Sequence, residues 1–242
     1  MFMLFKNFFK ALFPLGYSCL CCGHEIFEED AFVCSECLPT LPFLKGRQCE
    51  KCGEPISIDK FCDRCASTNF PFKKVISPFA YSGIVAYAIR KLKYSNRKNF
   101  AEFLSAYMAK VFLSHAIKCD FAIAVPLCSV RLKQRGYNQA EVLAKAFCKR
   151  AKIKLENNVL ARTKTTPSQT SLDFAERLAN MKDSFEVVNK DLVANKTILI
   201  IDDVFTTGAT ITECANALKS AGAKEVFAIT AGHTVLKFAK SV

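Results

Sequence analysis

Four C-x-x-C units stand in a row near the start of the chain, and they constrain how it folds more than any other feature. They are Cys19/Cys22, Cys34/Cys37, Cys49/Cys52 and Cys62/Cys65. The first and third units are each followed by a glycine, at Gly23 and Gly53, so the order C-x-x-C-G then C-x-x-C occurs twice. Such short segments bury little core, so the repeat indicates a module held together by other means.

Zinc is the use of these cysteines that the spacing favours. A tetrahedral zinc ion takes four thiolates, and a two-residue gap lets one tight turn direct two sulfurs at the same metal. Disulfides would compete, but nothing in the sequence directs the chain to an oxidising compartment. A redox C-x-x-C would be one pair near a βαβ unit, whereas here four pairs follow one another. Since all eight positions are cysteine, we expect two structural Zn²⁺ sites with no position open for water.

The repeat also suggests how the units pair. Sequential pairing would place Cys19, Cys22, Cys34 and Cys37 on one ion and Cys49, Cys52, Cys62 and Cys65 on the other. Interleaved pairing stays open, and we expect Cys21 to be a bystander. We expect removal of Cys49 and Cys52 together to unfold the second half of the module while the C-terminal domain stays folded.

The cysteine pattern divides the 242 residues, of which 51% are hydrophobic, into unequal parts. We expect a short amphipathic helix over residues 1–16, a double zinc ribbon over 17–70 and an α/β domain over 71–242. Charge follows the same division. Residues 1–70 hold seven Lys/Arg against nine Asp/Glu, a net −2, whereas residues 71–242 hold 27 against 13, a net +14. The larger domain is therefore expected to meet an acidic partner.

The opening stretch MFMLFKNFFKALFP has apolar residues at helical spacing and two lysines on the other side. It is too short to span a bilayer and lacks a small-residue cleavage site. We expect a cytoplasmic protein without a membrane span, with this helix docked on the protein itself. A weak membrane-surface contact, which would make the protein peripheral to the inner membrane, is the alternative.

Strand and helix patterns alternate after Pro71. Strands are predicted over residues 73–81, 121–127, 197–202 and 225–230, and three of the four are near-continuous apolar runs. Such runs are typical of a parallel sheet covered on both faces. Between them, Asn138 with Glu141 and Thr210 with Glu213 predict capping boxes at two helix starts. The domain is therefore expected to be α/β.

The stretch ILIIDDVFTTGAT, residues 198–210, reads as strand, loop and helix start. In an open α/β sheet, ligands bind beyond the carboxyl ends of the strands, where Asp202 and Asp203 would stand. The loop offers hydroxyls and the amides of a helix N-terminus, which suit an anion. Vicinal hydroxyls or a divalent cation suit the acids, and a ribose 5-phosphate offers both. An ATPase strand can also end in two acids, but the sequence contains no G-x-x-x-x-G-K-[ST] and no G-x-G.

The same stretch looks like the phosphoribosyl pyrophosphate (PRPP) signature of type I phosphoribosyltransferases. Together with VPL (125–127), RGYNQ (135–139) and the cysteine pairs, it resembles the ComF family over nearly the whole chain. The resemblance implies a Rossmann-like, mostly parallel phosphoribosyltransferase fold behind a double zinc ribbon, and a link to DNA uptake in natural competence. Phe205 stands where the signature usually has an aliphatic residue.

The resemblance also implies roles for particular residues. Asp202 and Asp203 would hold the ribose hydroxyls, and Mg²⁺ would accompany the pyrophosphate. The 5-phosphate would be held by Thr206, Thr207, Gly208, Ala209 and Thr210. A loop carrying Arg131, Lys133 and Arg135 would be placed for pyrophosphate or DNA, although a basic surface loop explains these residues equally. Residues 162–177 suit a mobile flap, with an ordinary surface loop as the equal alternative.

Two functions remain open at this stage. One is a PRPP-binding protein that works with the DNA-uptake machinery and binds single-stranded DNA through its basic domain. No acid occurs between Arg64 and Ala101, and the candidate DNA residues there are Arg90, Lys91, Lys93, Tyr94 and Arg97. A solvated helix face is the alternative for them. The other function is an active phosphoribosyltransferase of nucleotide salvage or related metabolism, for which the sequence assigns no catalytic residue and no acceptor.

Overall fold

The computed structural model describes residues 17–27, 31–94, 98–164 and 183–235, in two compact units, residues 1–41 and 42–242. The expected helix over residues 1–16 and most of the 162–177 segment lie outside the described residues. The first unit contains β1 (Tyr17–Ser18), β2 (Glu25–Ile26) and the 3-10 helix η1 (Leu38–Thr40). The second unit contains α2 (Asp63–Ser67), β3 (Lys74–Ile76), β4 (Phe79–Ala80), α3 (Gly83–Tyr94), α4 (Lys98–Ser114), β5 (Phe121–Ala124), α5 (Ser129–Arg135), α6 (Gln139–Ala151), β6 (Leu160–Arg162), β7 (Phe185–Val187), α8 (Lys190–Val193), β8 (Thr197–Phe205), α9 (Ala209–Ser220) and β9 (Glu225–His233).

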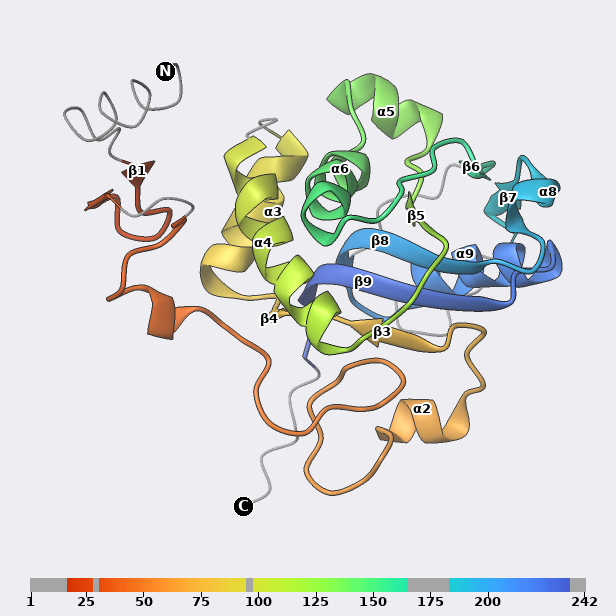
Figure 1. Ribbon diagram of the computed structural model, residues 1–242, viewed down its shortest axis with the longest axis horizontal. Helices are drawn as coiled ribbons and strands as arrows, with labels where there is room; N and C mark the ends of the chain where they lie inside the picture. Colours follow the sequence, from red (N-terminus) through yellow and green to blue (C-terminus); the bar gives the residue numbers. More distant parts are fainter. Residues whose placement is uncertain (1–16, 28–30, 95–97, 165–182, 236–242) are drawn as a thin grey trace, which may run out of the picture. The chain divides into compact units, whose positions relative to one another are not determined.

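A parallel sheet organises the second unit (Figure 1). Its strand order is β3-β9-β8-β5, and β4 also pairs with β9. Every one of these pairings is parallel, which confirms the expected sheet type. Strand β8 continues three residues beyond its predicted end at Asp202, because β9 is equally long and pairs with it as far as Phe205↔His233. The two acids therefore lie inside the last part of a hydrogen-bonded strand.

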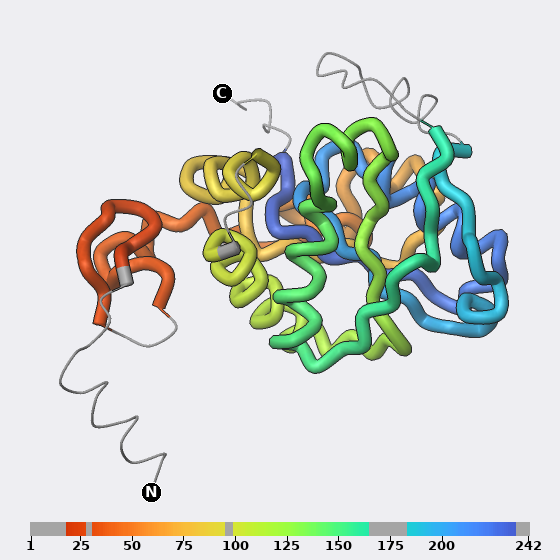
Figure 2. Tube along the Cα trace, turned by 90° about the horizontal axis from the view of Figure 1, so that it is seen from above, coloured from red at the N-terminus to blue at the C-terminus, as the bar shows by residue number. Residues whose placement is uncertain are grey.

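The sheet is buried on both faces. Ile198 and Ile200 of β8 share a core cluster with Ile211 and Cys214 of α9. The intervening Leu199 is fully buried as well, and alternation along a strand directs it to the opposite face. Helices α4 and α6 pack together, with α6 against β8 and α4 against β9, and Figure 2 shows them side by side along the sheet. This two-sided burial explains the near-continuous apolar runs of the sequence.

Of the two predicted capping boxes, the N-cap at Asn138 is confirmed and the cap at Thr210 is wrong. The Asn138 side chain accepts a hydrogen bond from the Ala140 amide and caps α6. Helix α9, by contrast, begins two residues earlier than expected, with Gly208 as its N-cap at φ 87° and no side-chain cap. Thr210 therefore lies within the first turn, and Glu213 instead accepts hydrogen bonds from the Asp183 amide and from Asn216.

Residues 129–135 form the short helix α5, although the sequence suggested a loop. Cys128 precedes the helix in an extended conformation, and Gly136 ends it at φ 76° with its amide bonded to the Leu132 carbonyl. The arginines and lysine of this segment thus stand on one short helix. Among all the helices that the structure describes, none is both long and apolar enough to cross a membrane.

Candidate functional site

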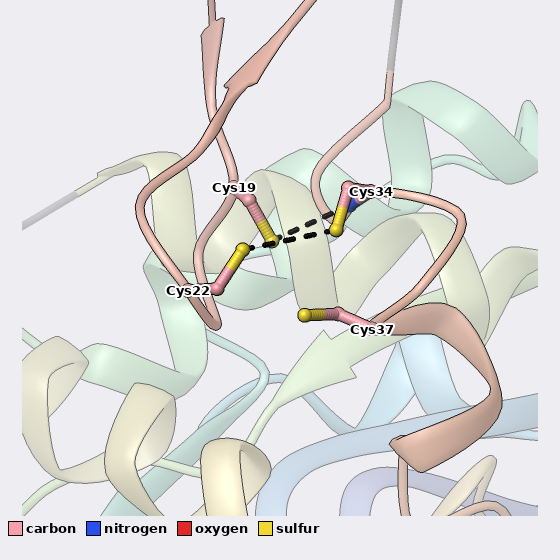
Figure 3. Close-up of side chains that lie close together, drawn as sticks. All are labelled: Cys19, Cys22, Cys34 and Cys37. Carbon is pink, nitrogen blue, oxygen red and sulfur yellow. Dashed lines mark hydrogen bonds between the residues drawn. The ribbon is translucent and has the colours of Figure 1, made fainter.

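Each sequential group of four cysteines comes together in space. Within the group Cys19, Cys22, Cys34 and Cys37 (Figure 3), and within the group Cys49, Cys52, Cys62 and Cys65, all sulfurs lie within 4.8 Å of one another. The Cys22–Cys34 and Cys52–Cys62 sulfur pairs are each 3.7 Å apart. A tetrahedral ion with Zn–S bonds of about 2.3 Å requires sulfurs about 3.8 Å apart. The cysteines therefore fit two four-thiolate zinc sites, paired sequentially and not interleaved.

The two sites begin with the same backbone turn. The Cys19 amide donates to the His24 carbonyl (2.7 Å) and the Gly23 amide to the Cys19 carbonyl (2.9 Å). In the second site, the Cys49 amide donates to Glu54 (2.8 Å) and the Gly53 amide to Cys49 (2.9 Å). Gly23 and Gly53 both have φ of 79°, a conformation that favours glycine. The duplication visible in the sequence is thus a duplicated metal-binding turn.

The two sites differ in their surroundings. The first lies in residues 1–41, and Cys22 is exposed there. In the second, Cys49 and Cys52 are 1% and 0% exposed and belong to the same core cluster as Phe72 and Val75. The Val75 amide of β3 also donates to the Lys51 carbonyl (2.8 Å). Independent unfolding of this second half, expected from the sequence, does not fit its burial in the core of the sheet-bearing unit.

A second candidate site surrounds the two acids of β8. Asp203 is 5% exposed, and its Oδ2 forms an ion pair with Lys93 Nζ of α3 at 3.0 Å. The Asp203 amide donates to Asp202 Oδ1 (2.8 Å). Burial lowers the pKa of Lys93, but the attraction of Asp203 more than offsets it, so the pKa is raised. Lys93, which the sequence placed among the DNA candidates, thus serves as the counter-ion of an acid.

Asp202 has no such counter-ion at contact distance among the described residues. Burial, together with the charge of Asp203, raises the pKa of Asp202 to about 7. The half-buried Arg162 of β6 is among the positive charges that act on Asp202 in the opposite direction. The sequence placed Arg162 only at the start of a flap, because nothing local in the sequence shows that Arg162 comes near Asp202.

The loop between β8 and α9 turns tightly. Gly208 has φ of 87°, and a Cβ atom there would lie 2.7 Å from the Phe205 ring, so this position excludes other residues on two grounds. Thr207 Oγ1 accepts from the Ala209 amide (3.4 Å), and Thr206 is exposed. The loop hydroxyls and the first amides of the 12-residue helix α9 therefore meet at the edge that carries the acids.

The basic candidates lie on α3 and α5. Arg90 and Lys133 are exposed, Lys91 and Arg131 are half-buried, and Arg97 lies outside the described residues. Tyr94 at the end of α3 is 75% exposed, and the Arg135 guanidinium lies 5.3 Å from the centre of its ring. This contact places Arg135 of α5 against the end of α3, the helix that also carries Arg90 and Lys91.

Known protein families match both parts of the chain. The double zinc ribbon domain matches residues 8–66, and the phosphoribosyl transferase domain matches residues 125–233. Competence protein ComFC of Streptococcus pneumoniae is 26% identical over 229 residues, covering 86% of this chain and 96% of that protein. The DNA utilization protein YhgH of Escherichia coli O157:H7 is 30% identical over 185 residues, covering 74% and 80%. The chain belongs to the ComF family.

A further ComF-family relative, Competence protein F of Haemophilus influenzae, is 26% identical over 230 residues, covering 91% of this chain and 96% of that protein. A glutamine phosphoribosylpyrophosphate amidotransferase structure from B. subtilis gives a TM-score of 0.40 at 18% identity, covering 58% of this chain and 30% of that one. The family matches and the observed sheet show that this ComF-family chain has a phosphoribosyltransferase domain with a parallel sheet and a double zinc ribbon.

Metal analysis can test the unequal roles of the two cysteine groups. Freshly prepared, reduced protein is expected to contain two zinc ions per chain. Cys22→Ser should remove about one ion and leave the melting of the sheet-bearing unit unchanged. Cys52→Ser should also remove about one ion, and it should lower the melting temperature of the sheet-bearing unit by about 10 °C, because loss of a buried ligand costs several kcal/mol. Cys21→Ser is the control and should retain both ions; one ion or none in the wild type would contradict the two sites.

The acids give a pH-dependent prediction. The carboxyl of Asp202 ionises near its ordinary value of 3.8 when unfolded and near 7 when folded. The folded protein therefore becomes less stable relative to the unfolded chain as the pH rises from 3.8 to about 7. Asp202→Asn should be more stable than the wild type by on the order of 2 to 4 kcal/mol at pH 8, with the gain vanishing near pH 4, as measured by thermal melts.

Asp203→Asn is the matched control for this effect. It leaves the mostly buried Lys93 without its partner, so it should destabilise the protein at pH 8. Equal effects of the two substitutions would contradict the different environments of the two carboxyl groups.

Proposed function

We propose that this protein binds PRPP at the edge formed by β8, the 206–210 loop and the start of α9. The observation that carries the proposal is the direct connection of two adjacent acids at the end of β8 to a glycine turn that opens a helix. Asp202 and Asp203 would accept hydrogen bonds from the ribose hydroxyls. Thr206, Thr207, Gly208, Ala209 and Thr210 would hold the 5-phosphate through hydroxyls and amides.

The charges around the acids support an anionic ligand. Two bare carboxylates would repel phosphates, but Lys93 neutralises Asp203, and the raised pKa of Asp202 allows it to carry a proton near neutral pH. The acids can thus contact the ribose while the helix N-terminus attracts the phosphate. Mg²⁺, if bound with the ligand, would add positive charge at the pyrophosphate, and carboxylate and hydroxyl oxygens are donors that suit it.

Calorimetry with PRPP tests this site. At pH 8, where Asp202 is largely ionised, Asp202→Asn and Asp203→Asn keep the side-chain shape but remove a charged acceptor, so each should weaken binding by about 1.5 to 3 kcal/mol. For Asp202→Asn the loss of affinity should accompany a gain in stability, which separates binding from folding. Lys196→Ala, a change at an exposed surface ion pair with Asp120, is the control. Unchanged affinity in both acid variants would place the ligand elsewhere.

An active phosphoribosyltransferase is the second candidate. The observation that favours it is Arg162, a half-buried cation close enough to Asp202 to affect its pKa. Positive charge placed there would stabilise a departing pyrophosphate. Release of pyrophosphate from PRPP across a panel of nucleobases and amines would separate the two candidates, because a binding protein binds PRPP without turnover.

We further propose a role in DNA uptake, in contact with other proteins of the uptake machinery and with single-stranded DNA. The relatives are named Competence protein F, Competence protein ComFC and DNA utilization protein YhgH. We define the basic face as Arg90, Lys91, Tyr94, Lys133 and Arg135. Tyr94 supplies an exposed aromatic ring, and the other four residues are cations. Such a face suits unpaired bases and their phosphates.

Salt dependence tests the DNA proposal. Each phosphate neutralised on a single strand contributes about −0.7 to the log-log salt slope, so Arg90→Ala, Lys91→Ala and Lys133→Ala together should make it shallower by about two units. Lys93 is omitted because it is the partner of Asp203. The measurement is fluorescence anisotropy with a labelled oligonucleotide at several salt concentrations.

The matched control removes three other lysines, Lys110, Lys118 and Lys149, which are exposed elsewhere on the domain. It carries the same change in net charge and should leave the slope nearly unchanged. Equal slopes for the two triple variants would show that binding follows net charge and not this face.

A further inference from the structure

We propose that Arg64 is a positioning residue that ties the second cysteine group to the 206–210 loop, so that an intact metal site keeps the loop in its binding conformation. The inference rests on the proposed binding of phosphate by this loop. It assigns a role in that binding to a residue of the zinc ribbon, 143 positions away in the sequence.

The backbone position of Arg64 is fixed by the metal site. Arg64 lies in α2, a five-residue helix preceded by Cys62 and containing Cys65. A helix of this length is not stable by itself, so its two cysteines, as members of one four-cysteine site, determine how it is held. The direction of the Arg64 side chain therefore depends on the integrity of that site.

The tip of Arg64 contacts the loop. Its NH1 group donates to the Thr207 carbonyl (3.1 Å), and its guanidinium lies 5.6 Å from the centre of the Phe205 ring. In a trans peptide the carbonyl and the following N–H point in opposite directions. By holding the Thr207 carbonyl, Arg64 also fixes the direction of the Gly208 amide, which is one of the proposed phosphate donors.

Phe205 provides a second connection between the metal site and the loop. Its ring lies 4.9 Å from that of His233, whose Nε2 donates to the carbonyl of the metal-ligating residue Cys52 (3.1 Å). On the loop side, Gly208 lies close against the same Phe205 ring. An aliphatic residue, usual at this position in the family signature, would offer Arg64 no aromatic face. Phe205, which departs from the family signature, and Arg64 of the ribbon thus contact each other.

Hydrogen exchange of the ligand-free, zinc-loaded full chain tests this role without relying on PRPP. In Arg64→Ala, amides of residues 206–210 should exchange about five- to tenfold faster, as expected for loss of one hydrogen bond to the loop. Both zinc ions should remain. Arg64→Lys retains a donor and should restore most of the protection. Arg47→Ala is the matched control, because Arg47 donates to the Ile58 carbonyl within the ribbon and should leave the loop unchanged.

A double-variant comparison tests the dependence on the metal site. Cys62→Ser should release one zinc ion and accelerate loop exchange, and adding Arg64→Ala should cause no further acceleration, since loss of the site already releases the Arg64 contact. Additive effects would overturn the proposal, as would unchanged loop exchange in Arg64→Ala with both ions bound.

PRPP calorimetry on the same variants completes the test. Arg64→Ala should bind about five- to tenfold more weakly and Arg64→Lys close to the wild type. Wild-type affinity in Arg64→Ala would overturn its role in binding. Absence of PRPP binding by the wild type would instead refute the proposed function, while the exchange measurements would still decide whether Arg64 holds the loop.

Discussion

The pairing of β8 with β9 over their full lengths is the constraint on which the rest of the second unit depends. Because the ladder continues to Phe205↔His233, the end of β8 carries the two acids and the loop, and the end of β9 carries the histidine beside the second cysteine group. Had β8 ended at Asp202, as its apolar run suggests, Phe205 would not be held against His233. Backbone hydrogen bonds thus set the spacing between two chemically unrelated sites.

The acids show how the proposed binding function would oppose stability in this fold. Strand burial places carboxyl groups where their charged forms are poorly solvated. A mostly buried lysine balances one of them, and the other responds by a raised pKa. A site of this kind can accept hydrogen bonds from hydroxyl groups only because the remainder of the core tolerates the strain of its charges.

Local patterns in the sequence were sufficient for much of this architecture. The parallel sheet, the cap at Asn138 and the two cysteine groups follow from periodicity, capping chemistry and metal-ligand spacing. The cap at Thr210 was wrong because a glycine in a left-handed conformation can start a helix without a side-chain acceptor. The α5 helix was missed because a seven-residue segment has too few turns to show a period.

Contacts between distant segments could not be predicted in the same way. The ion pair of Lys93 with Asp203 and the hydrogen bond of Arg64 with Thr207 join residues more than one hundred positions apart. No local pattern distinguishes a lysine directed at a buried acid from one directed at solvent. The proximity of Arg162 to Asp202 likewise depends on where β6 lies beside the sheet.

The duplicated metal-binding turn has a consequence for how the protein would respond to competition for zinc. Two copies of one turn stand in different environments, one with an exposed sulfur at Cys22 and the other with Cys49 and Cys52 sealed in a core. A chelator reaches Cys22 of the first site directly, whereas in the second site only Cys62 and Cys65 are partly exposed, and the other two ligands are released only when part of the core opens. The two ions should therefore leave at different rates, and a partly depleted population would consist mainly of chains that have kept the inner ion.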